Sequence, residues 1–221
     1  MPEDPSPAIA VSTVIFRVHR EQEGERGHLE LPLVRRVRQP YLGRWALPGG
    51  PLHPTESLRD AARRNLRETT GLDPRHLEQL YTFGAVERSP SDRVVSIVYW
   101  ALVRDDEADR ARLGENVAWF DADQVPELAF DHDEIVMWAL KRLRAKVGYT
   151  RIAHALLTDE FTLADLRGVT EAILSRRLDA ANFRRQVEAS GTVEPTGRFQ
   201  AGGRHRPPAL YRSTAQEELL R

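Results

Sequence analysis

Hydrophobic positions in the first two thirds of the chain follow two periods. Where apolar and β-branched residues alternate with polar ones, one side of an extended segment can face a core, so these stretches predict strands. The predicted strands cover 8–19, 28–38, 45–47, 80–86, 94–103 and 117–120. Apolar residues at helical spacing predict helices over 56–70 and 132–146. Strands interleaved with two helices predict an α/β or α+β domain that ends near Lys146.

The helix predicted over 56–70 carries signals at both ends. Thr55 stands just before it, and its side-chain oxygen can cap the first free N–H groups. Gly71 follows it and can adopt the left-handed conformation that ends many helices. The segment 39–55 before the helix is rich in proline and glycine. We therefore expect a long loop that leads directly into a helix with defined ends.

From residue 149 the pattern changes to short capped helices. Thr162 and Asp165 have the spacing of a capping box, and Asp179 offers a second N-cap. The segment 192–213 has the glycine and proline content and the short apolar ends of a hairpin. Helices followed by a hairpin are typical of a winged helix-turn-helix. The predicted domains are therefore an α/β domain over 1–148 and a winged helix domain over 149–221.

Composition narrows the class of protein. Hydrophobic residues make up 41% and charged residues 29%, the balance of an ordinary globular chain, and the net charge is -1. The chain has no cysteine, which excludes disulfides, thiolate zinc sites and cysteine nucleophiles. No apolar run approaches the ~18 residues of a membrane helix, and the first residues lack a secretory pattern. We expect a cytoplasmic protein without a membrane partner.

Positive charge is concentrated near the C-terminus. Residues 175–212 contain eight arginines against three acidic residues. In the predicted helix 180–189, two arginine side chains point away from the apolar stripe and an asparagine lies on the flank near the N-terminus. These side chains suit base edges and phosphates in a major groove. The candidate residues for double-stranded DNA are Asn182, Arg184 and Arg185 of this helix and Arg198, Arg204, His205 and Arg206 of the hairpin. The alternative is a solvated charged face on an accessory helical domain.

The segment 50–72 resembles the Nudix box, G-x5-E-x7-R-E-U-x-E-E-x-G-U, where U is a bulky aliphatic residue. The matching residues are Gly50, Glu56, Arg64, Leu66, Glu68, Gly71 and Leu72. The segments 45–50 and 128–132 are also similar to those of the family. The resemblance spans about residues 8–146 and implies an α/β/α Nudix sandwich. In many members it also implies hydrolysis of a nucleoside diphosphate linked to another group.

The carboxylates of the box are incomplete. Three glutamates at i, i+3 and i+4 lie on one helical face and can jointly hold Mg²⁺. Here these positions are Asn65, Glu68 and Thr69, so two carboxylates are missing. We assign no catalytic residue and no metal ligand, and we expect no required cofactor. The alternative is a rearranged metal site that recruits a carboxylate outside the box, such as Glu87 or Glu115.

Arginines near the expected cleft are candidates for binding a diphosphate, because the planar guanidinium forms bidentate, charge-assisted hydrogen bonds. The segment 82–96 resembles a Nudix subgroup that carries Arg-Asp-Pro-Arg there, although only Arg88 and Pro90 match. The candidate ligand-binding residues are Arg36, Arg44, Gly49, Gly50, Glu68 and Arg88.

The incomplete box, the capped helix pair and the basic hairpin together resemble the Nudix-related transcriptional regulators of NAD metabolism, the NrtR family. The resemblance covers nearly the whole chain. It implies a homodimeric repressor that binds a palindromic operator near NAD biosynthesis or salvage genes, with ADP-ribose or a related NAD-derived metabolite as effector. The alternatives are a Nudix pyrophosphohydrolase acting on ADP-ribose-like substrates through a rearranged metal site, and an inactive interaction module.

Overall fold

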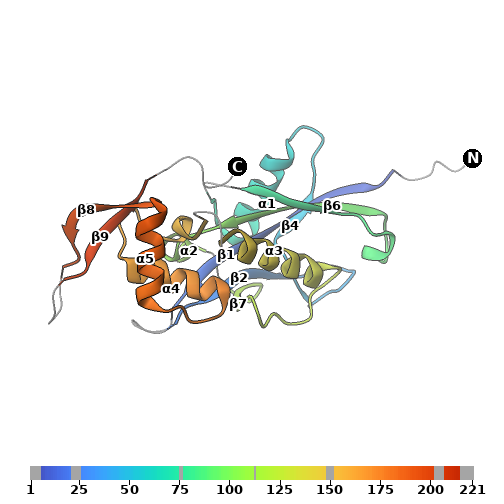
Figure 1. Cartoon of the computed structure of the whole chain (residues 1–221). Helices are drawn as coiled ribbons and strands as arrows, with labels where there is room; N and C mark the ends of the chain where they lie inside the picture. Colours follow the sequence, from blue (N-terminus) through green and yellow to red (C-terminus); the bar gives the residue numbers. More distant parts are fainter. Residues whose placement is uncertain are drawn as a thin grey trace, which may run out of the picture. The chain divides into compact units, whose positions relative to one another are not determined.

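The computed structural model describes residues 6–20, 26–74, 77–111, 113–147, 152–201 and 207–214 (Figure 1). The chain forms two compact units. The first unit consists of Met1–Arg17 and Glu30–Lys141, and the second consists of Val18–Leu29 and Arg142–Arg221. The domain boundary predicted between 148 and 149 falls outside the described residues and stays a prediction.

The first unit is built on a mixed seven-stranded sheet. Its main path runs β3-β2-β1-β6-β5, with β4 paired to β1 and β7 paired to β2. β1 and β6 are parallel, whereas the β1–β4, β2–β3, β2–β7 and β5–β6 pairs are antiparallel. The strands are β1 (Ala8–His19), β2 (His28–Arg35), β3 (Trp45–Ala46), β4 (Gly49–Pro51), β5 (Glu78–Phe83), β6 (Val94–Leu102) and β7 (Val117–Asp121).

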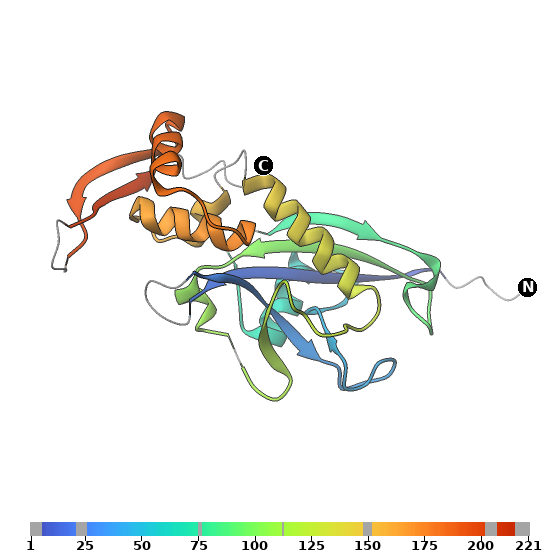
Figure 2. The same cartoon turned by 60° about the horizontal axis from the view of Figure 1, so that its bottom comes forward.

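Two helices cover this sheet from opposite sides, α1 (Leu58–Thr70) and α3 (His132–Val147) (Figure 2). Alternate residues of the central strand β1 serve the two sides: Val11 and Ile15 belong to the cluster that packs against Ala62 and Leu66 of α1. Short helical turns also occur at η1 (Val86–Arg88) and α2 (Asp105–Ala108). The predicted α/β sandwich is therefore confirmed.

Three boundaries differ from the sequence prediction. The N-cap of α1 is Ser57 and not Thr55, because the Ser57 hydroxyl accepts a hydrogen bond from the Asp60 N–H at 3.2 Å and donates to the Asp60 carboxylate at 2.6 Å. The strand predicted over 80–86 ends at Phe83, and the next residues form the η1 turn. β2 ends at Arg35, because the backbone of Arg36 already bonds within the following loop.

The second unit contains the predicted helices and hairpin. Its elements are η2 (Ile152–Leu156), α4 (Leu163–Leu174), α5 (Ala180–Ser190), β8 (Val193–Phe199) and β9 (Ala209–Ser213). The predicted caps are confirmed: Thr162 and Asp165 form a capping box at α4, and Asp179 accepts from the Asn182 N–H at 2.8 Å at α5. α5 ends at Gly191 with φ 63°. β8 and β9 pair antiparallel as the wing.

A buried carboxylate fixes the turn between α4 and α5. The Glu171 side chain is almost fully buried and accepts the Leu178 N–H at 2.8 Å, while Arg177 donates to its other oxygen at 3.4 Å. A buried charge is stable only when it is paired and hydrogen-bonded, and Glu171 meets both conditions. The start of α5 is therefore held by a side chain of α4.

No helix in the described part of the chain is both long enough and apolar enough to cross a bilayer.

The start of α3 is tied to the β3–β4 loop by a buried histidine. The Leu47 N–H donates to His132 Nδ1 at 2.9 Å, so this nitrogen must be unprotonated. Burial lowers the pKa of His132 to about 4, although the neighbouring Asp131 opposes the shift. The imidazole is therefore a neutral structural acceptor.

We expect acidification to destabilise the protein through His132. Its pKa of about 4 in the folded state lies below the ordinary 6.5, so the unfolded chain binds the proton more tightly. This stabilisation is complete above about pH 6.5 and is lost as the pH falls toward the folded-state pKa of about 4. The linkage predicts a loss of about 2 kcal/mol between about pH 7 and pH 5.

The matched variant is His132→Asn, whose side-chain oxygen can still accept the Leu47 N–H but does not titrate. Urea unfolding at several pH values should give a flatter pH dependence for the variant than for the natural protein. An equal decrease in the free energy of unfolding of both proteins on acidification would contradict the lowered pKa of His132.

Candidate functional site

The first unit contains a cavity of about 630 Å³, a size typical of small-molecule sites. It is lined by strands β1, β2 and β4 and by the loops that carry Arg88 and Phe130. Among the candidate ligand-binding residues, Arg36, Gly49, Gly50 and Arg88 line it, whereas Arg44 and Glu68 do not. The structure therefore brings together four of the six candidates.

Arg36 is held against an aromatic ring at the cavity. Its guanidinium lies 4.6 Å from the centre of the Phe130 ring, and its Nε donates to the Pro40 carbonyl at 2.7 Å. Burial lowers the pKa of Arg36 below its ordinary value. Within the described residues, its two Nη groups make no hydrogen bond. A cation fixed in this way has N–H donors available for an anion in the cavity.

Arg88 and Arg44 are engaged within the protein. Arg88 donates through Nε and Nη2 to both oxygens of Asp131, at 2.9 and 2.7 Å, and its side chain is 5% exposed. Arg44 pairs with Glu127 at 2.5 Å, outside the cavity lining. The two Arg88 N–H groups expected to bind a ligand thus bind the Asp131 carboxylate. A role of Arg88 or Arg44 in ligand binding stays a prediction.

Gly49 and Gly50 form the wall of the cavity where β4 runs beside β1. A Cβ on Gly49 would lie 2.7 Å from the Val11 carbonyl oxygen, and one on Gly50 would collide with the Asn65 side-chain oxygen. Only glycine therefore allows β4 to approach both β1 and α1 this closely.

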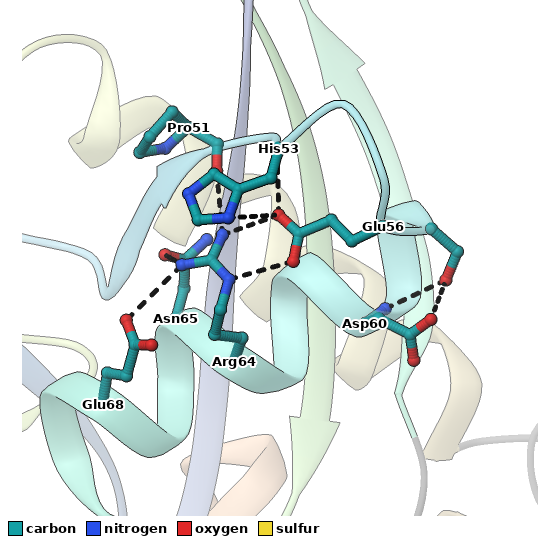
Figure 3. A network of polar contacts seen from close by, with 8 residues as sticks. Pro51, His53, Glu56, Asp60, Arg64, Asn65 and Glu68 are labelled. Carbon is teal, nitrogen blue, oxygen red and sulfur yellow. Dashed lines mark hydrogen bonds and ion pairs between the residues drawn. The ribbon is translucent and has the colours of Figure 1, made fainter.

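The ion pair between Glu56 and Arg64 holds the loop before α1. Arg64 donates to both oxygens of Glu56, at 2.9 and 2.7 Å, and to the Pro51 carbonyl at 3.0 Å (Figure 3). The hydrogen bonds from Arg64 lower the pKa of Glu56 to about 2. The His53 N–H adds a further donor to Glu56 at 2.8 Å. Glu56 and Arg64 thus have a structural role.

The residues at the metal positions of the box do not fit Mg²⁺. Arg64 Nη1 donates to the Asn65 oxygen at 3.1 Å and approaches Glu68 at 3.4 Å (Figure 3). The Thr69 hydroxyl donates to the Asn65 backbone carbonyl at 2.6 Å, and Glu68 is 63% exposed. One carboxylate and one amide beside a guanidinium, with a hydroxyl bonded to the helix backbone, are a poor donor set for a hard cation.

Glu87 and Glu115, which we considered as replacement ligands, are exposed and do not line the cavity. Within the described ranges, no cluster of three histidine, aspartate or glutamate side chains is arranged to hold a metal ion.

Two contributors to the site, Phe130 and Asp131, could not be assigned from the sequence. Both lie in the family-like segment 128–132, but their partners Arg36 and Arg88 are far away along the chain. Phe130 also has φ 60°, a conformation that sequence patterns do not indicate for an aromatic residue.

The candidate recognition helix α5 is exposed along most of its length. Asn182, Arg184 and Arg185 are all exposed, and the half-buried residues are Phe183 and Val187. Ala180, in the first turn of α5, is exposed and does not share the half-buried side of Phe183 and Val187.

The exposed side chains of α5 are organised by local contacts. Arg184 pairs with Glu188 at 2.9 Å, and Arg185 lies 3.5 Å from the Asn182 side-chain oxygen. On the hairpin, Arg198 is exposed and forms an ion pair with Glu160. The other three hairpin candidates, Arg204, His205 and Arg206, lie outside the described residues.

Comparison with known proteins covers both units. The chain matches the family model of the NUDIX domain over residues 8–139 and that of the NrtR DNA-binding winged helix domain over residues 153–213. The ADPR responsive transcriptional repressor NtrR of Acinetobacter baylyi is 34% identical over 218 residues, which cover 96% of this chain and 84% of that protein. The ADP-ribose pyrophosphatase of Methanocaldococcus jannaschii is 31% identical over 130 residues, covering 59% and 71%.

The solved structures of Shewanella oneidensis NrtR are similar over the same extent. The protein alone has a TM-score of 0.79 at 34% identity and 94% coverage of both chains. Its complex with a 27mer DNA has a TM-score of 0.77 at 32% identity and 93% coverage of both. Its NUDIX domain complexed with ADP ribose has a TM-score of 0.53 at 33% identity, covering 63% of this chain and 90% of that one. The chain therefore belongs to the NrtR family, in which a Nudix domain is followed by a DNA-binding winged helix domain.

Proposed function

We propose that this protein is a transcriptional repressor whose Nudix unit binds ADP-ribose or a related NAD-derived metabolite and whose winged helix binds operator DNA. One combination of features carries the proposal. The Nudix unit keeps a ligand-sized cavity but has lost the donor set for Mg²⁺, and the same chain presents an exposed, arginine-bearing helix. A sensor requires a site that binds its metabolite without hydrolysing it.

The DNA-binding side rests on α5 and the wing. Asn182, Arg184 and Arg185 extend from the first two turns of a helix with no fully buried residue, so the helix can enter a major groove without unfolding its own unit. Arg198 extends from the hairpin and can contact the adjacent backbone. Shewanella NrtR has been solved with a 27mer DNA, which supports the same role here.

The effector side rests on the cavity and on Arg36. A diphosphate requires cationic donors. The two Nη groups of Arg36 can donate to it, because Phe130 and Pro40 hold this side chain at the cavity. The relatives support the choice of ligand, because Acinetobacter NtrR is described as ADPR responsive and the NUDIX domain of Shewanella NrtR has been solved with ADP ribose.

Three further elements belong to this proposal. A homodimer binds a palindromic operator, because a two-fold protein matches a two-fold site. The regulated genes lie in NAD biosynthesis or salvage, and the protein acts in the cytoplasm. No cofactor or metal ion is required for binding.

The second candidate function is a pyrophosphohydrolase. The similarity to the ADP-ribose pyrophosphatase of Methanocaldococcus jannaschii favours it. The contacts of Asn65, Glu68 and Thr69 argue against it. Arg64 donates to the Asn65 and Glu68 side chains, and the Thr69 hydroxyl donates to the Asn65 backbone carbonyl, so a guanidinium stands where a divalent cation would be held.

Substitution of the recognition helix should reduce operator affinity. We expect Arg185→Ala, and separately Arg184→Ala, to weaken the binding free energy by about 1–3 kcal/mol if a base contact is removed. If a phosphate contact is removed, the slope of log affinity against log salt concentration should fall by about one. The operator is first found by sequencing DNA that the protein retains from its own genome, and affinity is then measured by fluorescence anisotropy.

The control is Arg67→Ala, which removes an exposed, ion-paired arginine from α1 and should leave operator affinity unchanged. Unchanged affinity of the Arg184→Ala/Arg185→Ala double variant at physiological salt would show that another element enters the groove.

The protein should not hydrolyse ADP-ribose in the presence of Mg²⁺. With one carboxylate left on the box face, no cation is held where the diphosphate would have to be activated. Release of AMP and ribose 5-phosphate is followed by chromatography. Turnover on the order of 1 per second or faster would establish the hydrolase instead.

Effector and operator should affect each other reciprocally. If ADP-ribose weakens DNA binding, operator DNA must weaken ADP-ribose binding by the same factor, and coupling of about 1–3 kcal/mol is typical. Calorimetric titration of ADP-ribose into the free protein and into its operator complex measures both sides. Identical affinities would leave the Nudix unit as a scaffold or as a sensor of another metabolite.

A further inference from the structure

Two neighbouring strands that line the cavity continue into the second unit. The beginning of β1 lines the cavity, whereas its end, Val18 and His19, belongs to the second unit. β2, its neighbour in the sheet, starts in the second unit and reaches the cavity at Val34 and Arg35. Each strand therefore joins the cavity wall to the unit that carries the winged helix.

The middle of β1 is packed too tightly to absorb a displacement. Val14, Ile15 and Phe16 are at most 1% exposed, and β1 is hydrogen-bonded to β2 on one side and to β6 on the other. Close-packed interiors have a low compressibility and transmit strain. A shift of the cavity wall is therefore transmitted along β1 to its end in the second unit.

Arg20 follows directly after β1 and lies against α4. A Cβ on Gly168 would be 2.5 Å from Arg20 Nη2 and 3.4 Å from its Cζ, so the guanidinium covers the backbone of α4 at this glycine. Arg20 Nη1 also lies 4.0 Å from the Asp165 carboxylate. Asp165 and Gly168 are three residues apart and share one face of the helix. We call this arrangement the Arg20–Gly168 contact.

The contact accounts for a glycine in the middle of a helix. Glycine is the least favourable residue in a helix interior apart from proline, because it loses the most backbone entropy. α4 continues for two more turns' worth of backbone after Gly168, up to Leu174, and the φ of Gly168 is not positive, so neither a helix end nor a left-handed turn calls for glycine there. The Arg20 guanidinium occupies the space that a side chain at this position would need.

α4 in turn holds the start of the candidate recognition helix. Glu171 follows Gly168 by three residues and accepts the Leu178 N–H at 2.8 Å, immediately before α5. A displacement of α4 therefore also displaces the start of α5.

We propose that the Arg20–Gly168 contact is the connection through which occupancy of the cavity changes the position of the recognition helix. Arg20 is a positioning residue in this proposal: it does not line the cavity, and it lies on neither α5 nor the hairpin. The proposal rests on the proposed function, because it needs both an effector and an operator.

The test measures the ratio of operator dissociation constants with and without saturating ADP-ribose, in the full-length protein by fluorescence anisotropy. A ratio of about 5–150 is typical of coupled sites. Gly168→Ala displaces the guanidinium and Arg20→Ala removes it, so each should bring the ratio close to one. ADP-ribose affinity of the free protein and operator affinity without effector should each stay within about threefold of the natural values, because neither binding site is touched.

Gly168→Ala separates coupling from folding. Alanine has the higher helix propensity, so the Tm of this variant should not fall below that of the natural protein. A general weakening of the fold cannot then explain a lost response to ADP-ribose. The double variant Arg20→Ala/Gly168→Ala should lose no more coupling than either single variant, because both substitutions remove the same contact.

Two matched substitutions serve as controls. Gly114→Ala adds a methyl group that meets no atom within 4 Å, and Arg67→Ala removes an exposed arginine of α1 that is paired with Asp73. Both variants should keep the natural ratio.

A natural ratio in Arg20→Ala or in Gly168→Ala would overturn the proposal, and so would variants that lose operator affinity in the absence of ADP-ribose. A ratio that changes only in Arg144→Ala would also overturn it, because Arg144 of α3 donates to the Ile173 carbonyl at 2.9 Å and α3 would then be the connection. The proposed function fails separately, if the natural protein itself binds its operator equally well with and without ADP-ribose.

Discussion

The Nudix unit depends on how Arg64 distributes its hydrogen bonds. Its guanidinium binds both oxygens of Glu56, the Pro51 carbonyl and the Asn65 side chain, so one cation fixes the loop, the end of β4 and the face of α1 together. The hydrogen bonds and negative charge of Glu56, followed by those of Glu68, raise the pKa of Arg64 above its ordinary value. The loop between β4 and α1 is therefore held by charge-assisted bonds from Arg64 in addition to its backbone hydrogen bonds.

The same arginine explains how the fold can be kept with only one of the three box carboxylates, Glu68. In a box with three glutamates, excess negative charge beside Arg64 calls for divalent cations. Here Asn65 and Thr69 are neutral, and Arg64 pairs with Glu56 and, at 3.4 Å, with the exposed Glu68. Neutral side chains at the two other positions leave no unpaired buried charge there, which would be costly. The cavity beside β4 is retained because its walls depend on Gly49 and Gly50 and not on the metal ligands.

Sequence patterns predicted the parts of the structure that are set by local chemistry. The capping box of Thr162, the N-cap of Asp179 and the left-handed helix end at Gly71 were confirmed because each signal lies within a few residues of its partner. The pairs Arg88–Asp131 and Leu47–His132 join segments 43 and 85 residues apart, and no spacing rule indicates such contacts. The box motif placed Gly49 and Gly50 at the cavity, but only the folded chain shows that Arg36 lines it while Arg44 and Glu68 do not.

The large apolar side chains on the exposed side of α3 are not explained by its packing on the sheet alone. The middle of its inner face is apolar, with Ile135, Ala139 and Leu143 buried. A helix with that single task would carry polar residues across its whole outer face. Instead Met137 and Trp138 stand at the centre of the outer face, where exposure to water is unfavourable. Two apolar faces on one helix are expected where the second face is also covered, so the outer face of α3 has the composition of a surface that functions while bound.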